Sequence, residues 1–430
     1  MLFNIDSNCS PELLYCLAQM GHGDELVIAD RNFPATSTAL QTCFQKVIPM
    51  PGFSALAAIK TITSLLPLDG FVDHAAVRME IDGAPEEMNE THTAVFSFLE
   101  TVIPDGAGDL TALNNADAVL VAPATRDVLA SHVHGLQHGP LMMALSVARS
   151  RTTPTLFAPS MHVDLANDPV TDDLVEAVRA QGAHVFWGPE EEGKRKTPSV
   201  ERLVAETAHA VNRNRPNRRN VVVTLGATRS AIDDVRHVQN TSSGATGWSI
   251  ADHLHKHGHD VTCVAGITSE AAPEWLPLVL RCPTPEAMLK ECLALSNDSI
   301  EAWIHAAAVL DYVVEAPAEG KLASQQGTLT LPLIESPKHI MELKDACASA
   351  VRIGFKLESG VKQTDLIHRA YAQIKKADMT AVVANRLEDL GVDGKPRGYL
   401  VDQQGSHFVL ETMEHLNDAV QTLVERGPEA

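Results

Sequence analysis

The chain is poor in aromatic residues, long apolar runs and cysteine pairs, and each of these absences argues against a class of protein or a kind of core. Only 4% of the 430 residues are aromatic although 45% are hydrophobic, so the core must be mainly aliphatic. Nowhere do eighteen apolar residues follow one another, and the first residues lack a basic region followed by a long apolar run. The seven cysteines are scattered, odd in number and never spaced as Cys-x-x-Cys, which fits a reduced compartment better than a disulfide scaffold. We expect a cytoplasmic protein without a membrane partner.

Positive charge is also scarce. Lysine and arginine total 34 against 55 aspartates and glutamates, which gives a formal net charge of -21. Nucleic acids and acidic membranes both need a positive field on their partner, so this balance argues against broad binding of either. A local basic pocket for a small anion is compatible with this negative net charge. The length predicts two or three domains, each large enough to bury its own core.

A short polar stretch divides the chain. "VNRNRPNRRN", residues 211–220, carries four arginines and a proline and is typical of an interdomain linker, which we place at 212–219. After it, short apolar runs alternate with amphipathic helical segments, from "NVVVTLG" (220–226) to "MTAVVAN" (379–385). This alternation predicts parallel βαβ units and a Rossmann-like parallel sheet over 220–430, closed by a hairpin and a helix.

The residues before the linker are also of the α/β type. "ADAVLVAPAT" (116–125), "TPTLFAPSM" (153–161) and "AHVFWGP" (183–189) are short apolar runs typical of buried strands. The first hundred residues predict a helix, a strand at "ELVIAD" (25–30) and a second helix at "SALAAIKTITSLLPLDG" (54–70). The topology of this αβα segment stays open.

The least ordinary stretch is "TRSAIDDVRHVQNTSSGATG", Thr228 to Gly247. It joins a strand to a helix through about twenty residues, whereas such connections usually have two to six, and loops of that length tend to be functional or disordered. Its hydroxyls, glycines and helix start suit a phosphate. Serine and glycine before a helix are equally ordinary capping and turn residues, so the loop alone does not decide.

A second segment adds weight to this interpretation. "AAAVLDY", residues 306–312, puts small residues and an acid at another strand end, and Lys321 follows ten residues after Asp311. Small residues let a ligand approach the backbone, and a lysine neutralises phosphate. An isolated lysine is more often a solvated surface group, so spacing alone favours that alternative.

These motifs together resemble phosphopantothenate–cysteine ligase. The resemblance rests on "TLGATRSAIDDVRHVQNTSSGATG", "AAAVLDY…GKLAS", "SPKHIMEL", "IGF" and "IKKADMTAVVAN", and covers residues 220 to the C-terminus. It implies an enzyme of coenzyme A synthesis that activates the carboxylate of 4′-phosphopantothenate with CTP and Mg²⁺. Cysteine then attacks the acyl-nucleotide and forms an amide. Both steps build negative charge, which preorganised donors would stabilise.

The resemblance also assigns roles to residues. Asn240 matches the position that holds the acyl intermediate, Arg236 the one that assists the cysteine step, and Lys321 the lysine that supports the activated carboxylate and the nucleotide phosphate. The remaining matches are the nucleotide pocket, at Ala307, Asp311 and Phe355, and the phosphate-cradling turns, at Gly226 and Ser243. No metal ligand is assigned.

Three departures from the family pattern concern the nucleotide. Bacterial ligases commonly have "SSGKMG", whereas this chain has Ala245 at the lysine position, so one phosphate contact is missing. "IGFKLES" replaces the usual "VGFAAET", and "ESPKHI" replaces "KNPDI". The choice between CTP and ATP therefore stays open, although the reaction class does not.

The middle segment, 98–211, resembles the second half of phosphopantothenoylcysteine decarboxylase, a flavoprotein usually fused ahead of this ligase. The similarity lies in "ADAVLVAPATRDVLASHVHG", "APSMHVDLANDP" and "GAHVFWGPEEEGKRK". Asp109 stands where that family has its catalytic histidine, His162 replaces the asparagine of "PAMN", and no cysteine precedes "GKRK". We find no counterpart of the flavin-phosphate loop, so we expect a decarboxylase relic without FMN.

The first segment, 1–97, resembles the fucose mutarotase and ribose pyranase family over "SPELLYCLAQMGHGDELVIADRNFPATS". Opening a sugar hemiacetal needs an acid and a base with pKa values near the working pH, and His22 with Asp24 and Asp30 nearby would supply them. The closing segment of that family, with its active-site tyrosine, is not recognisable. Mutarotase activity and a non-catalytic role in folding or assembly are therefore both open.

Two further expectations concern assembly and metals. The resemblances imply a homo-oligomer, at least a dimer, and a catalytically silent assembly protein is the alternative to an active ligase. "DHLHKHGHD", residues 252–260, looks like a metal box, but no ligand set completes it and histidines in a last helical turn suit the helix dipole. We expect a solvated helix end there, and the same for His132, His134 and His138.

Overall fold

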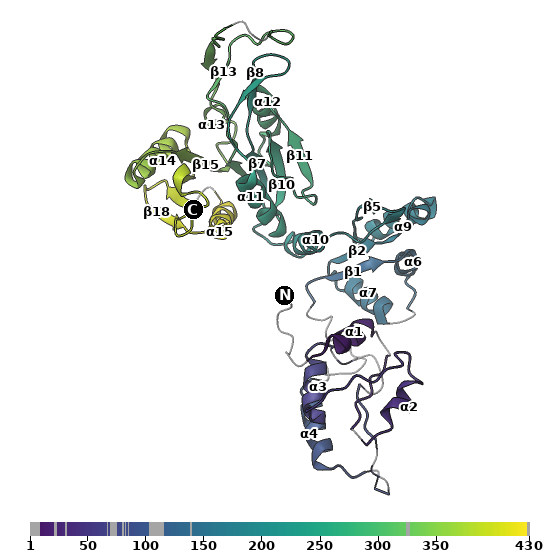
Figure 1. Ribbon diagram of the computed structural model, residues 1–430. Coiled ribbons are helices and arrows are strands. Elements are labelled where there is room, and N and C mark those ends of the chain that lie inside the picture. Colours follow the sequence, from purple (N-terminus) through teal and green to yellow (C-terminus); the bar gives the residue numbers. More distant parts are fainter. Residues whose placement is uncertain are drawn as a thin grey trace. The chain divides into compact units, whose positions relative to one another are not determined.

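The computed structural model describes residues 9–20, 24–30, 32–66, 68, 75–79, 81, 83–84, 86–102, 116–137, 140–323 and 327–427. The chain forms two compact units (Figure 1). One comprises residues 1–119 and 127–155, and the other comprises 120–126 and 156–430. The mixed α/β class and the parallel sheet expected from the sequence are confirmed. Within these ranges no helix combines the length and apolarity needed to cross a membrane.

The first unit is helical in its described parts. Its helices are α1 (Pro11–Gln19), α2 (Ala35–Ala39), α3 (Ala55–Thr63), α4 (Glu90–Leu99), most of α6 (Arg126–His134) and α7 (Pro140–Ser150). Ser10 and Ser54 begin α1 and α3 because their hydroxyls accept hydrogen bonds from backbone N–H groups of the first turn. Leu13, Leu17 and Ile62 join the two helices in a small core.

The strand expected at "ELVIAD" is wrong. Residues 24–30 have no regular secondary structure, and Val27 and Ile28 are 66% and 41% exposed. An apolar run becomes a strand only when a neighbouring strand pairs with it, and no described segment does so here. The helices predicted on either side are confirmed as α1 and α3.

The second unit opens with a small parallel sheet in the order β1 (Val119–Ala124), β2 (Thr155–Pro159), β4 (His184–Val185). Its other strands are β3 (Met161–His162), β5 (Glu190–Glu191) and β6 (Lys194–Arg195), and its helices are α8 (Val163–Ala166), α9 (Pro169–Ala180) and α10 (Val200–Asn212). Asp168 caps α9 through the N–H of Val170, with Pro169 in the first turn.

The last part of the chain builds an eight-stranded sheet in the order β11-β10-β7-β12-β15-β16-β17-β18. The first six strands in this order run parallel to one another. The last two, β17 and β18, form the predicted antiparallel hairpin. The bounds are β7 Asn220–Leu225, β10 Asp260–Ala265, β11 Leu278–Arg281, β12 Ala302–His305, β15 Val351–Glu358, β16 Ala381–Arg386, β17 Gly398–Asp402 and β18 His407–Leu410. In chain order this is 3-2-1-4-5-6 plus a hairpin, the doubly wound Rossmann arrangement.

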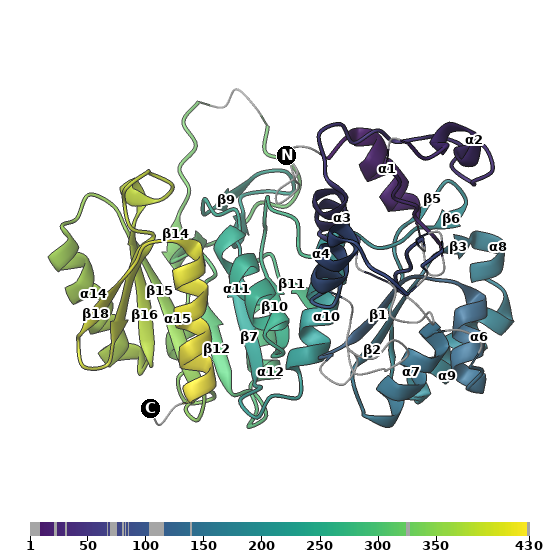
Figure 2. The same cartoon turned by 90° about the horizontal axis from the view of Figure 1, so that it is seen from below.

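Helices cover both faces of this sheet (Figure 2). On one face α11 (Ala245–Lys256) packs on Val221, Val223 and Leu225 of β7, and α15 (Met413–Arg426) packs beside α11 on β15 and β18. On the other face α12 (Pro285–Leu295) packs near Val222, and α14 (Gln363–Ala377) covers β16 and β17. Successive residues of a strand point to opposite faces, so a strand buried on both sides must be apolar throughout.

Residues 337–350, one of the amphipathic segments between the apolar runs, are helical over only a short part. Only α13 (His339–Glu342) is helical, and turns follow it as far as residue 349. Arg352, 2% exposed, donates to the carbonyls of Ile340 and Ala377 at 2.6 Å each. This buried guanidinium binds the carbonyl oxygen of Ile340, which a longer α13 would use for its own hydrogen bonds.

The stretch interpreted as a linker continues directly from α10. His209 contacts the carbonyl of His255 at 2.8 Å, and the amide of Asn212 donates to the carbonyl of Lys256 at 2.7 Å. These bonds fasten the end of α10 to the end of α11, so residues 213–219 form a short turn before β7.

Candidate active site

The reversal of strand order between β7 and β12 creates the crevice in which open α/β sheets bind ligands. The connection after β7 runs from residue 226 to 244, and the one after β12 leads to β13 (Tyr312–Val314). Ala227 bridges both neighbours, with hydrogen bonds of 2.8 and 2.7 Å to Ile267 and a parallel bridge to Ala308. Three loops therefore meet at the carboxyl ends of β7, β10 and β12.

The long connection is not an irregular loop. It folds into a hairpin of β8 (Arg229–Ala231) and β9 (His237–Gln239), and β13 pairs with β14 (Leu333–Glu335) in a second hairpin. The hydroxyl of Ser230 accepts from the N–H of Val314 at 2.9 Å and links the two. Side chains carried by either hairpin are thus held relative to the crevice.

Two of the expected positions act through their backbone. Gly226 has φ +77°, and a Cβ there would lie 2.8 Å from the carbonyl oxygen of Ile267 and from the methyl of Thr268. Only glycine fits such a close approach. The N–H of Ala307 donates to the hydroxyl of Thr224 at 3.4 Å, and its small side chain leaves room at the end of β12.

Asn240 lies at the end of β9 and faces the loop after β12. Its side-chain nitrogen donates to the carbonyls of Ala308 and Val309, both at 3.1 Å. An amide nitrogen has two hydrogens, so both donors are used and Oδ1 is left as an acceptor. The residue fixes the loop and presents an oxygen to the half-exposed crevice.

Sequence reasoning missed Asp233, in the turn of the first hairpin, whose carboxylate is fully buried. Oδ1 accepts from the N–H groups of Val235 and Arg236 at 2.9 and 2.7 Å, and Oδ2 accepts from the N–H of Leu322 at 3.1 Å. The guanidinium of Arg236 lies 2.6 Å from Oδ2. Its spacing three residues before Arg236 was the only available signal.

Burial raises the pKa of Asp233, but hydrogen bonds from Val235, Arg236 and Leu322 outweigh it and lower the pKa to about 2. The carboxylate is therefore charged at every pH at which the protein would be assayed. It anchors Arg236, which also donates to the carbonyl of Leu322 at 2.7 Å.

This cluster brings Arg236 and Lys321 together. Leu322 is held by Asp233 and Arg236, and the N–H of Ala318 donates to the carbonyl of Ile232 at 2.9 Å. Lys321 directly precedes Leu322, and its side chain is exposed. Arg236 and Lys321, 85 residues apart in sequence, thus lie on two segments that Asp233 ties together.

The other expected residues are more dispersed. Asp311 is exposed and lies 3.7 Å from the ammonium of Lys338. Phe355 sits on β15, two strands from β7, and packs on the core under α11 and α15. The hydroxyl of Ser243 accepts from the N–H of Ala245 at 3.3 Å, beside the start of α11. His22 lies outside the described residues.

No cluster of three or more His, Cys, Asp or Glu suited to a metal occurs in the described ranges. Mg²⁺ commonly relies on substrate phosphates with only one or two carboxylates, so the residues present fit a nucleotide-carried ion rather than a protein cage. Asp311 is the carboxylate nearest the end of β12 along the chain.

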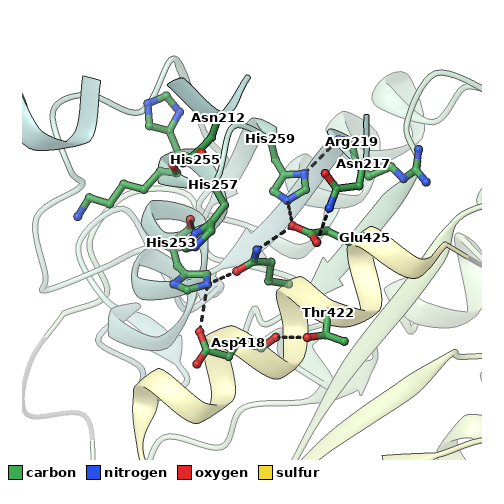
Figure 3. A network of polar contacts seen from close by, with 12 residues as sticks. Asn212, Asn217, Arg219, His253, His255, His257, His259, Asp418, Thr422 and Glu425 are labelled. Carbon is green, nitrogen blue, oxygen red and sulfur yellow. Dashed lines mark hydrogen bonds and ion pairs between the residues drawn. The ribbon is translucent and has the colours of Figure 1, made fainter. Parts of the chain in front are cut away.

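The histidines of residues 252–260 are not a solvated helix end, contrary to expectation (Figure 3). His255 and His259 are 3% and 1% exposed, and His253 contacts Gln421 of α15 at 2.7 Å. The ring of His255 stacks on His209 of α10 with centroids 4.1 Å apart. The histidines fill the junction of α10, α11 and α15. His132 is likewise buried, His134 is exposed, and His138 lies outside the described residues.

Acidification should weaken this junction. Burial, with smaller contributions from His209 and Lys256, lowers the pKa of His255 to about 3, whereas an unfolded chain binds the proton near pH 6.5. Between these values only the unfolded state is protonated, so stability falls as pH falls. One such site costs about 2 kcal/mol between pH 6.5 and 5. Urea unfolding at pH 7 and pH 5, followed by circular dichroism, measures the change.

His255→Phe keeps the ring and its burial and should lose less stability over this interval than the wild type. His415→Phe, at an exposed position of α15, is the matched control and should follow the wild type. Identical pH dependence in all three proteins would contradict the assignment to His255.

In the middle part of the chain, the polar groups at the strand ends bond to one another. Where β1 and β2 end, Arg126 pairs with Asp168 at 2.7 Å and the hydroxyl of Ser160 donates to the carbonyl of Arg195 at 3.0 Å. His162 caps α8 by accepting from the N–H of Asp164 at 3.3 Å. Because these groups satisfy one another, they do not form an open site that fits a flavin. Asp109 lies outside the described residues.

Three family models match the chain. The DNA/pantothenate metabolism flavoprotein C-terminal domain matches residues 217–425, the Flavoprotein family 86–212, and the RbsD / FucU transport protein family 4–115. All three resemblances inferred from sequence motifs are thereby confirmed. The flavoprotein match corrects one expectation, because it shows that the decarboxylase-related part is present and implies FMN, which we had expected to be missing.

Curated relatives extend over most of the chain. The coenzyme A biosynthesis bifunctional protein CoaBC of Thermococcus kodakarensis is 32% identical over 70% of this chain and 73% of its own length. That of Mycobacterium tuberculosis strain H37Rv is 28% identical over 83% and 90%. A solved DNA/pantothenate metabolism flavoprotein from Streptococcus pneumoniae is 23% identical, with a TM-score of 0.45, over 48% of this chain and 99% of its own.

Proposed function

The chain belongs to the family of coenzyme A biosynthesis bifunctional proteins CoaBC, and from this membership we propose that its C-terminal domain joins 4′-phosphopantothenate to cysteine. It is an enzyme of coenzyme A biosynthesis with a phosphopantothenate–cysteine ligase domain and a flavoprotein part. The observation that carries the proposal is Asn240, bonded to the loop after β12 at the switch point of the sheet.

The reaction takes two steps. An oxygen of the 4′-phosphopantothenate carboxylate bonds to the α-phosphorus of the nucleotide, and pyrophosphate leaves with the electrons of the broken phosphoanhydride bond. The cysteine amine then bonds to the acyl carbon, the nucleoside monophosphate leaves, and the amine loses a proton. Oδ1 of Asn240 is suited to accept a hydrogen bond from that amine, because its two N–H donors already hold the loop.

The positive charges of Arg236 and Lys321 determine the roles that we propose for them. Arg236 and Lys321 lie on two segments tied together by Asp233 and would stabilise the negative charge that develops on the acyl and phosphoryl oxygens. We propose that Asp311, Ala307 and Phe355 line the nucleotide pocket and that Gly226 and Ser243 lie against its phosphates. Mg²⁺ would supply Lewis-acid stabilisation of the same phosphates.

One assay tests the proposal. The protein is incubated with Mg²⁺, 4′-phosphopantothenate, cysteine and either CTP or ATP, and mass spectrometry follows the amide and the released CMP or AMP. Product with one nucleotide supports the ligase and identifies its cosubstrate, which Ala245 leaves open. Absence of product with both nucleotides would refute the ligase and favour the silent assembly protein.

We infer three functional modules, 1–97, 98–211 and 220–430, joined by the linker 212–219, and a homo-oligomer of at least two chains. The match of residues 86–212 to flavoproteins supports a decarboxylase-related middle module. Reconstitution with FMN, followed by its visible absorbance after gel filtration, tests whether this module binds flavin. Sedimentation measures the oligomer.

A second candidate function is sugar mutarotation by the first module. The match of residues 4–115 to the RbsD / FucU family supports it. Anomer exchange of fucose and ribose, observed by saturation-transfer NMR, should be fast with the wild type and should fall to the uncatalysed rate in His22→Ala. Asp30→Asn keeps the histidine and should reduce exchange less. Equal exchange with and without protein would refute this candidate.

A further inference from the structure

The first turn of α11 is built for an acceptor that the protein does not provide. Its N-cap is Gly244, which has φ +84° and no side chain to accept from the N–H groups of the first turn. These groups carry partial positive charge and lack intrahelical partners. The hydroxyl of Ser243 accepts from the N–H of Ala245, the first of these groups. A helix start alone does not define a site, but three side chains converge on this one.

The first is Trp248, which is 4% exposed. Its indole Nε1 has no hydrogen-bond partner among the described residues and lies 3.4 Å from the position that a Cβ on Gly244 would take. The indole nitrogen thus lies beside the N-cap. A buried donor without an acceptor is costly, and such groups in native structures are usually completed by a ligand or water.

The second is Arg281, at the end of β11. Its Nη1 lies 3.4 Å from the hydroxyl of Thr268, whose methyl packs against Gly244. Its guanidinium carbon lies 5.4 Å from the centre of the Trp248 ring. This cation–π contact holds the charge beside the N-cap without neutralising it.

The third is Arg397, which precedes β17 and reaches the hydroxyl of Thr246 in the first turn of α11. Burial lowers the pKa of this half-buried guanidinium. Neither Arg281 nor Arg397 forms an ion pair within the described part of the chain. Arg281 is exposed, whereas the half-buried charge of Arg397 is unfavourable unless a counter-charge compensates it.

We propose that Arg281 and Arg397, with the indole N–H of Trp248, form a phosphate subsite at the start of α11. They supply the positive charge that Ala245 lacks where related ligases have a lysine. The subsite rests on the proposed function only for the identity of its ligand, the phosphates of the nucleotide. Its chemistry, two guanidinium groups and an N–H around a helix start, suits pyrophosphate by itself.

Calorimetric titration of the full chain with pyrophosphate and Mg²⁺ tests the subsite. Arg281→Gln and Arg397→Gln should each weaken binding at least tenfold, and Trp248→Phe should weaken it severalfold. Arg369→Gln removes an exposed guanidinium on α14 and should bind like the wild type. In the double arginine variant, Ala245→Lys should restore part of the affinity.

The possible outcomes distinguish a failure of the phosphate subsite from a failure of the proposed ligase activity. Pyrophosphate binding that depends on both arginines, without amide product, would support the subsite and refute the ligase. Amide formation with wild-type pyrophosphate affinity in both arginine variants would refute the subsite alone. Thermal unfolding monitors folding, and Arg397→Lys, which keeps a cation, should retain more affinity than Arg397→Gln if charge is responsible.

Discussion

Asn240→Asp is expected to lower the rate of amide formation by about 10²- to 10³-fold, the usual cost of removing one well-placed polar group from a transition state. The asparagine donates to Ala308 and Val309, both at 3.1 Å, and offers Oδ1 to the crevice. An aspartate has no N–H to give these carbonyls. It also adds negative charge beside a reaction that builds negative charge itself.

Nucleotide binding should change little, because Asn240 lies at the end of the β8–β9 hairpin, five residues before the start of α11. Turnover is measured by release of the nucleoside monophosphate and binding by titration with a nonhydrolysable nucleotide. Gln239→Glu, the same amide-to-acid change at the exposed neighbouring position, is the control and should stay near wild-type turnover. Equal losses of binding and turnover in Asn240→Asp would assign the residue a structural role.

The sheet was predictable because its strands are buried on both faces. "NVVVTLG" and "MTAVVAN" each contain a continuous apolar run at their centre and no charged residue, and helices that alternate with such runs leave few arrangements other than a parallel sheet. The site positions Gly226 and Asn240 were found because they stand in recognisable motifs. The residue pattern of each motif and its place in the chain were enough to identify these two positions.

The contacts that complete the site depend on tertiary structure and left little trace in the sequence. Arg397 and Thr246 are separated by 151 residues, and no spacing rule joins them. The histidines at the end of α11 appeared solvated because their cover comes from α10 and α15. Arg352, a charge in an apolar run, is buried because distant helix ends offer carbonyls. In each case a partner far along the chain overrides the local preference.

Asp233→Asn should lower kcat by about 100-fold, because it releases both cations of the candidate site. An asparagine oxygen can still accept from Val235 and Arg236 N–H groups, but its Nδ2 would face the N–H of Leu322 and the Arg236 guanidinium, donor against donor. Arg236 and Lys321 would then shift together. A displacement of about 1 Å at a reacting centre can cost this much.

A split between kcat and KM separates positioning from mere folding. If Asp233 orients the cations that act on the activated carboxylate, kcat falls while KM for the nucleotide changes little. Asp234→Asn, at the exposed neighbour, should leave kcat unchanged. A lower melting temperature with wild-type kcat would show that Asp233 only ties the two loops.

The pH dependence of Asp233 is distinct from that of the buried histidines. With its pKa held at about 2, this carboxylate stabilises the fold above the ordinary pKa of 3.8, and the contribution is lost as pH falls from there towards 2. The histidine junction loses stability from pH 6.5 downward. Asp233→Asn should therefore leave the loss of stability between pH 6.5 and 5 intact while lowering kcat throughout it, since Arg236 and Lys321 need their anchor at every pH.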